Sequence, residues 1–250
     1  MDRFRTLHGA LVAMAICAAG LLAATAAAEE VDGRWGVEVE GGLWKFVEGY
    51  WDHSNVDDFL GLGVRRGLGD HWVATLSYRY GTLRPGSYDP TEDVGWTLDA
   101  RSWLHTEVHN PTLSFEYLLR PDASFRPYAG LGVGLTAWRV LAADDGSGWF
   151  PSGTTVQGYA TDGEEFETLQ STDFTLSGEL GAEWWLGETL SLRLAARYHV
   201  LPGNDLDNIG HSSWELSRSP DYVDANKGLV QGVFGATLWF GGPGDADNDG

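Results

Sequence analysis

The sequence predicts an all-β fold, an eight-stranded antiparallel up-and-down transmembrane β-barrel. Three observations predict it. The 250-residue chain begins with a secretory leader, eight later runs alternate apolar and polar residues, and the connections between these runs alternate between short and long. An even number of strands joined by alternating short turns and long loops is typical of outer-membrane barrels. A soluble β-sandwich gives no reason for such regular alternation.

The first 28 residues have the features of a secretory signal peptide. Arg3 and Arg5 form a short basic start, residues 10–24 are apolar, and residues 26–28 are alanines that suit a signal peptidase. The apolar run is shorter than the roughly 20 residues that a spanning helix needs, which disfavours a membrane anchor. We expect cleavage directly after the alanines. The only cysteine, Cys17, lies in this segment, so the mature chain has no disulfide.

The predicted barrel domain covers residues 29–240. Its eight strand-like runs lie at residues 34–47, 57–67, 71–82, 106–119, 126–141, 172–186, 190–201 and 228–240. The short connections fall at residues 67–70, 120–125 and 187–189. The long ones fall at residues 48–56, 83–105, 142–171 and 202–227.

The connection at residues 187–189 fixes a register between two runs. If it is a three-residue turn, Glu183 lies opposite Arg193 and Glu179 lies opposite Arg197. Opposite charges in cross-strand positions are favourable. A two-residue turn would mix the apolar and polar faces, so we reject it.

The polar faces of the runs carry charges of both signs that we expect inside the barrel. An eight-stranded barrel is too narrow for an open aqueous channel, so these charges have to pair. We favour a structural plug of ion pairs over the alternative, a gated ion path. The predicted lumen residues are Glu38, Glu40, Arg65, Arg79, Glu116, Glu179, Glu183, Arg193 and Arg197.

Aromatic residues lie near the ends of the runs, as in the girdles at the two membrane interfaces. The candidates are Trp35, Trp72, Trp103, Trp138, Trp184 and Trp239, although some of them would also suit loop or lumen packing. The last run alternates apolar residues on one face and ends on Phe240. It resembles the terminal strand that bacterial barrel-assembly machinery recognises.

The chain resembles outer-membrane β-barrel families: the OmpA-like transmembrane domain and the OmpX-like and opacity-type barrels. The resemblance covers about residues 33–240 and rests on the segments 125–135, 179–183 and 190–198. It implies an outer-membrane location. It does not assign a role, because these families include anchors, adhesion proteins, host-interaction proteins and small-solute channels.

The C-terminal tail, residues 241–250, is a Gly/Pro linker followed by alternating acidic residues. Asp245, Asp247 and Asp249 match the first half of a calcium-binding loop, in which alternate carboxylates face one hard cation. The tail has two interpretations: it is a solvated acidic tail, or it is the start of a calcium-binding repeat. In OmpA-like proteins, such a repeat links the barrel to a periplasmic domain. We expect at most weak calcium binding and no other cofactor.

An enzyme is the least favoured interpretation. His211 and Ser213 faintly resemble the His-x-Ser of lipid A deacylases, but Trp214 stands where an Asn is expected. A His and a Ser two residues apart arise easily by chance. We therefore expect no enzymatic activity.

The formal charge of −20, from 16 basic and 36 acidic residues, excludes nucleic-acid binding. We expect a monomeric protein of the cell outer membrane, with a structural or surface-interaction role through its long extracellular loops. A narrow solute or ion pore is the first alternative, and a lipid A-modifying enzyme is the second. The expected partners are outer-membrane lipid, lipopolysaccharide and the barrel-assembly machinery.

Overall fold

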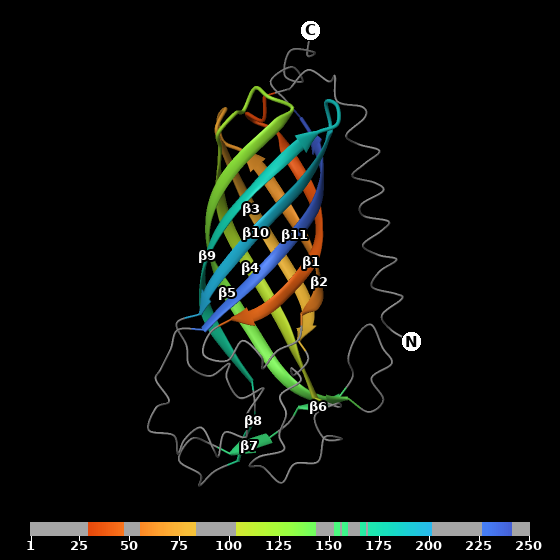
Figure 1. Cartoon of the computed structure of the whole chain (residues 1–250), viewed down its shortest axis with the longest axis vertical. Coiled ribbons are helices and arrows are strands. Elements are labelled where there is room, and N and C mark those ends of the chain that lie inside the picture. Colours follow the sequence, from red (N-terminus) through yellow and green to blue (C-terminus); the bar gives the residue numbers. More distant parts are fainter. Residues whose placement is uncertain are drawn as a thin grey trace.

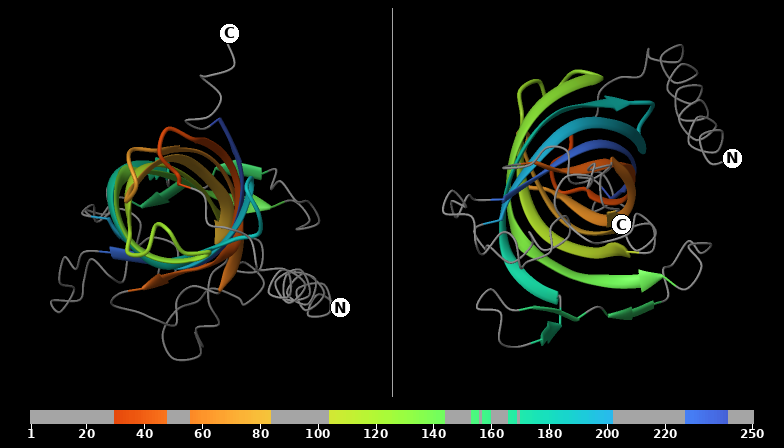
Figure 2. Two further views of the ribbon diagram at one scale, coloured as in Figure 1. Left: turned by 90° about the horizontal axis from the view of Figure 1, so that it is seen from above. Right: turned by 60° about the horizontal axis from the view of Figure 1, so that its bottom comes forward.

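Eight long antiparallel strands close into one barrel in the computed structural model (Figure 1 and Figure 2). The structure describes residues 30–47, 56–83, 104–143, 153–155, 157–159, 166–168, 170–201 and 227–241. The barrel strands are β1 (Trp35–Val47), β2 (Asp57–Gly67), β3 (Trp72–Leu83), β4 (Leu104–Leu118), β5 (Phe125–Ala143), β9 (Gln170–Trp185), β10 (Leu190–Leu201) and β11 (Lys227–Phe240).

Each barrel strand pairs with the next one in the chain, and β1 pairs with β11 to close the ring. This topology confirms the predicted up-and-down barrel, and the predicted runs end within two residues of the observed strands. Among the described residues, no helix has the length and apolarity to cross a membrane.

The segment between β5 and β9 contains three short strands that the sequence analysis assigned to a loop. They are β6 (Gly153–Thr155), β7 (Gln157–Tyr159) and β8 (Phe166–Thr168). Strand β6 pairs with the end of β5, and β7 pairs with β8. These pairings lie beyond the barrel at the end opposite the short turns (Figure 1).

The three short turns lie at one end of the barrel, which we call the periplasmic end because outer-membrane barrels carry their short turns there (Figure 1). The turn between β9 and β10 contains Gly187 with φ of 128°, a conformation that favours glycine. Leu186 N–H donates to the Leu190 carbonyl at 2.8 Å. The register places Glu183 opposite Arg193, as predicted for a three-residue turn.

The outer wall of the barrel is apolar. Leu62, Leu131 and Leu180 are 62, 75 and 69% exposed, although they lie in the middle of strands. An apolar surface that surrounds a whole barrel is costly in water and favourable in hydrocarbon. The outer wall therefore faces lipid.

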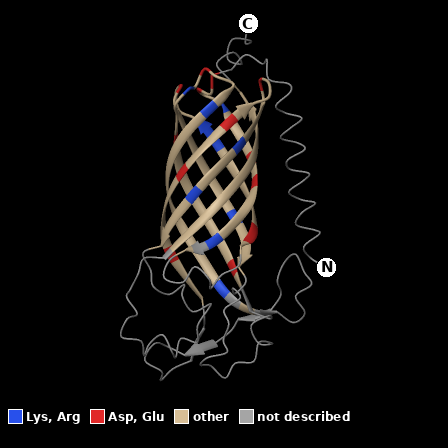
Figure 3. Ribbon diagram, in the orientation of Figure 1, with Lys and Arg blue, Asp and Glu red and all other residues tan. Residues whose placement is uncertain are grey.

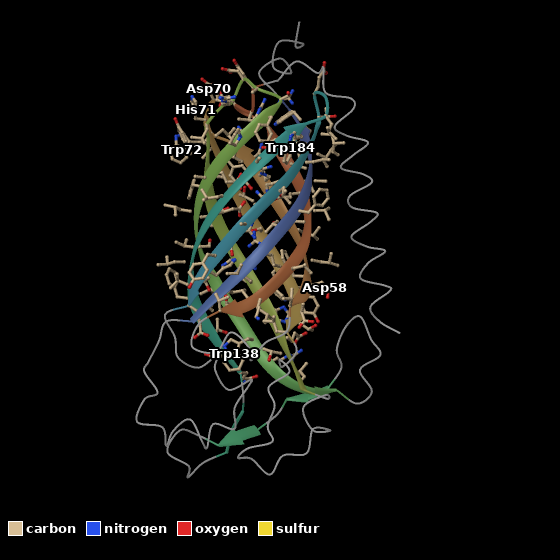
Figure 4. All side chains as sticks on the ribbon, in the orientation of Figure 1. Asp58, Asp70, His71, Trp72, Trp138 and Trp184 are labelled. Atoms are coloured by element: carbon tan, nitrogen blue, oxygen red, sulfur yellow. The ribbon has the colours of Figure 1, made fainter. Side chains whose placement is uncertain are left out.

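Aromatic side chains mark the periplasmic edge of this wall. Trp35 and Trp72 are exposed, and Trp184 is half-buried. Trp72 packs edge-on against Tyr117 with ring centroids 5.0 Å apart, and Trp184 packs against Phe125 at 4.9 Å. Figure 4 shows Trp72 pointing away from the barrel. These residues fit the predicted girdle.

Two of the girdle candidates lie inside the barrel, which is the lumen packing that the sequence analysis left open for some of them. Trp138 and Trp239 are 3 and 1% exposed because their strand positions face inward. Their indole N–H groups donate to Asp173 at 3.0 Å and to Ser191 at 2.8 Å. A buried indole needs such an acceptor. Trp103 lies outside the described residues.

The inward-facing side chains form apolar layers near both ends of the lumen. We define the periplasmic apolar layer as Val31, Val73, Leu118, Trp185 and Trp239. We define the extracellular apolar layer as Trp44, Phe59, Leu83, Val108, Trp138, Leu201 and Leu229. All of these side chains are buried, and the nine charged residues predicted for the lumen lie between the two layers along the strands. The buried acidic residues Asp57 and Asp173 lie at the extracellular layer.

The ladder between β4 and β5 is interrupted at Asn110 and Pro111. Pairing runs up to His109 and resumes at Thr112 in the same register. Proline has no N–H to donate to the partner strand. The side-chain amide of Asn110 donates to the Leu135 carbonyl at 3.1 Å instead.

Candidate functional site: the barrel lumen

The nine charged residues predicted for the lumen all lie on the inner face of the barrel. Each is at most 8% exposed. Figure 3 shows acidic and basic positions interspersed along the strands. We call this set the lumen network: Glu38, Glu40, Arg65, Arg79, Glu116, Glu179, Glu183, Arg193 and Arg197.

Arg65 connects opposite walls of the barrel. Its Nη1 lies 2.8 Å from Glu183 Oε1, and its Nη2 lies 2.7 Å from Glu116 Oε2. Three strands separate β2 from β9 in either direction around the ring. Arg65 also donates to Thr237 Oγ1 at 3.1 Å. The contact with Glu183 therefore crosses the full width of the lumen.

Arg193 is the most connected member of the lumen network. Its guanidinium lies 2.7 Å from Glu116, 3.1 Å from Glu38, 3.2 Å from Glu40 and 3.6 Å from Glu179. One cation thus joins carboxylates from three other strands, β1, β4 and β9.

The remaining contacts extend the network towards the extracellular end. Arg79 Nε contacts Glu40, and Arg197 Nε contacts Glu179. Arg197 also donates to Gln231 Oε1 at 2.9 Å and lies 3.4 Å from Glu40. The predicted register partners Glu179 and Arg197 therefore form an ion pair.

The other expected pair differs from the prediction. Glu183 and Arg193 are register partners, but the carboxylate of Glu183 contacts Arg65 and accepts a hydrogen bond from the Ser191 hydroxyl. Arg193 turns to Glu116 and the β1 carboxylates instead. In a closed narrow barrel, side chains from the opposite wall compete with the cross-strand neighbour.

Two further inward-facing residues lie in the charged region, and the sequence analysis missed both. Tyr128 donates its hydroxyl to Glu179. Arg126 is buried, and its guanidinium lies 4.4 Å from the centroid of the Trp185 ring. The alternation of residues along β5 gives the signal for both, because they share the inner face with Gly130.

A polar layer of uncharged side chains follows on the extracellular side of the network. Asn110 Nδ2 donates to Thr136 Oγ1 at 2.9 Å, and Thr136 and Thr175 hydroxyls lie 2.7 Å apart. His199 and Gln231 are fully buried beside this layer on β10 and β11. The sequence analysis did not single out these residues, since neutral polar side chains occur on either face of a strand.

A second polar cluster lies on the outer face at the extracellular ends of β3, β4 and β5. Arg139 Nε contacts Glu107, and Tyr80 donates to Glu107 Oε1 at 3.0 Å. His109 Nε2 lies 3.6 Å from Glu107, and its Nδ1 lies 2.6 Å from the Tyr78 hydroxyl. The cluster ties three strands together where the apolar wall ends.

Several predicted positions lie outside the described residues. These are His211, Ser213, the tail residues Asp245, Asp247 and Asp249, and the signal segment 1–28. Within the described ranges, no group of three His, Cys, Asp or Glu side chains is placed to hold a metal ion.

A closed up-and-down barrel with an apolar outer wall and a filled polar interior defines an integral outer-membrane β-barrel protein. The model of the outer membrane protein beta-barrel domain matches residues 14–216. The chain belongs to this family, and it is a protein of the cell outer membrane.

Solved structures of outer-membrane barrels resemble the chain in fold. Neisserial surface protein A (NspA) has a TM-score of 0.51 at 13% identity, covering 84% of this chain and 100% of that one. OprG from Pseudomonas aeruginosa has a TM-score of 0.47 at 15% identity, covering 86% of this chain and 100% of that one. Ail, the attachment invasion locus protein of Yersinia pestis, has a TM-score of 0.44 at 10% identity, covering 84% of this chain and 99% of that one. No curated protein matches the sequence.

Proposed function

We propose that this protein is a non-conducting outer-membrane barrel with a structural or surface-interaction role. The observation that carries this proposal is the crossing of the lumen by the lumen network. Arg65 bridges Glu116 and Glu183, and Arg193 bridges β10 to β1 and β4. Apolar layers lie on both sides of the network. The rigid barrel then serves as a support for its extracellular connections.

The energetics of the lumen oppose ion passage. An ion that crosses the barrel has to separate buried ion pairs, and removing one partner of such a pair costs about 3–5 kcal/mol. It also has to pass the buried tryptophan and aliphatic side chains of the two apolar layers. This is why we favour the filled barrel over the alternative, a narrow solute or ion pore.

Single-channel recording in planar bilayers tests the proposal. The wild-type barrel is expected to give no steady openings. A quadruple variant, Arg65→Ala, Glu116→Ala, Glu183→Ala and Arg193→Ala, hollows the lumen and is expected to conduct, which shows that inserted barrels are detected. Steady wild-type openings with ion selectivity would establish the pore.

Shortening the long connections separates a structural from a surface-interaction role. Cells that lack the gene are complemented with wild type or with a variant whose connections 84–103 and 202–226 are replaced by short turns. A structural role predicts that both chains restore resistance to detergent. A surface-interaction role predicts that only the wild type restores adhesion to other cells.

The barrel is proposed to have no enzymatic activity. Mass spectrometry of lipid A from cells with and without the protein tests this, with His211→Ala as a matched variant. A mass change that depends on His211 would establish the lipid A-modifying alternative.

We also propose that the tail binds calcium weakly through Asp245, Asp247 and Asp249. Calorimetric titration of the refolded chain with calcium is expected to give millimolar affinity, as in weak extracellular sites. A variant with Asn at all three positions should abolish the heat. Equal heats from both chains would contradict the site.

A further inference from the structure

The outer wall contains a groove of about 940 Å³ that crosses β4, β5, β9, β10 and β11. Its sides are formed by Tyr117, Leu131, Leu180 and Tyr198, which all point out of the barrel. Its lining is almost entirely apolar.

The register explains how the groove forms. One row across the sheet places Leu131, Gly178 and Tyr198 side by side. The adjacent row on the same face places Ala129, Leu180 and Ala196 side by side. Large and small residues thus alternate in opposite order in the two rows. The small residues Ala129, Gly178 and Ala196 form a floor that bends around Leu180, and the large residues form the sides.

The position of the groove identifies what covers it. It lies within the lipid-facing wall, so hydrocarbon is its natural occupant. One end reaches Trp72 and Tyr117, which belong to the aromatic edge at the periplasmic end. Hydrocarbon entering from that edge belongs to the periplasmic leaflet, whose lipids are phospholipids rather than lipopolysaccharide.

Polar groups that suit a headgroup flank this end of the groove. His71 stacks on Tyr117 with ring centroids 5.2 Å apart and planes 11° apart. Its Nδ1 is fixed by a 2.8 Å contact with the Leu118 carbonyl. Figure 4 shows His71 beside Trp72 at the edge of the barrel. Arg120 is exposed in the turn that follows Tyr117 by three residues.

We propose that this groove holds one acyl chain of a phospholipid from the periplasmic leaflet, with the phosphate near Arg120 and His71. The small side chains of Gly178 and Ala196 make room for the chain. An added Cβ at Gly178 meets nothing within 4 Å, so a larger side chain there begins in open space and extends into the groove. This inference rests on the membrane location and holds whether or not the lumen conducts.

Native mass spectrometry tests the groove. The full-length protein is reconstituted in vesicles of equal parts phosphatidylethanolamine and phosphatidylglycerol. It is then extracted in mild detergent, and the mass of the protein with its bound lipid is measured. The wild type is expected to retain one phospholipid. The double variant Gly178→Leu and Ala196→Leu should retain about tenfold less, because the space for several methylene groups is filled.

The matched control is Ala74→Leu, a similar enlargement on the outer wall of β3 outside the groove. It should retain lipid like the wild type, and circular dichroism and heat-modifiable gel mobility confirm folding of every variant. Equal retention by the groove variant and the control would overturn the proposal. Two further outcomes would also overturn it: retention of lipopolysaccharide in preference to phospholipid from mixed vesicles, and dimers that the groove variant abolishes.

A separate variant tests the headgroup contact. Arg120→Gln is expected to weaken retention of phosphatidylglycerol several-fold while retention of diacylglycerol, which lacks the phosphate, is unchanged. An equal loss of both lipids, or no loss of either, would overturn the placement of the phosphate at this turn.

Discussion

Glu183 and Arg193 stand opposite each other on β9 and β10, yet the Glu183 carboxylate binds Arg65 on the other side of the lumen, 2.8 Å from Oε1 to Nη1. The rule that pairs opposite charges between neighbouring strands describes an open sheet. Inside a ring of eight strands, long side chains from opposite walls meet at the centre. Arg65 contacts Glu183 there, and Arg193 Nη1 lies 2.7 Å from Glu116 Oε1.

Double-mutant cycles are expected to rank these contacts. With Gln replacements, the coupling energy between Glu183 and Arg65 should be about 1–3 kcal/mol, the range for residues in direct contact. The coupling between Glu183 and Arg193 should be smaller, because the two groups are adjacent but not bonded. Reversible urea unfolding in phospholipid vesicles measures both, with the Glu179 and Arg197 pair as the positive reference. A larger value for Glu183 with Arg193 would contradict the observed network.

Removing the most connected cation should be the most costly change in the lumen. Arg193→Met keeps the bulk of the side chain but leaves Glu38, Glu40 and Glu116 with less compensation. We expect the free energy of unfolding to fall by about 3–5 kcal/mol. Arg139→Met at the rim is the control, because its guanidinium is half-exposed and such pairs contribute about 1 kcal/mol or less. Similar losses for the two variants would show that the network does not stabilise the fold.

The strands and their register could be predicted from the sequence because both depend on local rules. Period-two alternation gave the bounds of each strand, and the turn at Gly187 set the offset between β9 and β10. The same alternation placed the charged residues on the inner face. The assignment of a residue to the inner or the outer face depends only on which side of the strand the residue occupies.

The partners of those residues could not be predicted, because they depend on distances across the ring. Nothing local distinguishes Arg65 from Arg193 as the partner of Glu183. Proximity to a strand end does not assign Trp138 and Trp239 to the girdle or to the lumen, because the side of the strand decides between the two, and both residues face inward. The long connections beyond the strands lack such periodicity.

The N-terminal segment should seal the periplasmic end through a close contact with Gly67. A Cβ at this position would lie 1.8 Å from the Val31 carbonyl oxygen. Val31 is fully buried, and Asp32 accepts a hydrogen bond from Gly69 N at 2.8 Å. Gly67→Ala is therefore expected to displace residues 30–34 and to speed hydrogen exchange at the Arg34 amide, which donates to Val31.

The control for this change is Gly232→Ala, whose added methyl group meets nothing within 4 Å. It should leave exchange at Arg34 unaltered. Protection of Arg34 that persists in Gly67→Ala would show that the segment does not depend on this contact.

Asn110 should compensate for the missing backbone donor of Pro111. Asn110→Ala leaves the Leu135 carbonyl unsatisfied inside the barrel wall and is expected to lower the free energy of unfolding by about 1–3 kcal/mol. Pro111→Val supplies an N–H at the interrupted step of the ladder. In the Pro111→Val protein, the loss in free energy of unfolding that Asn110→Ala causes should be smaller by about 1 kcal/mol, since the backbone N–H at position 111 now donates to the Leu135 carbonyl. Unfolding of the four chains in parallel measures the difference. If the two losses are equal, the asparagine stabilises the barrel through its side-chain contacts with Thr136, Thr112 and Arg79 rather than through the Leu135 carbonyl.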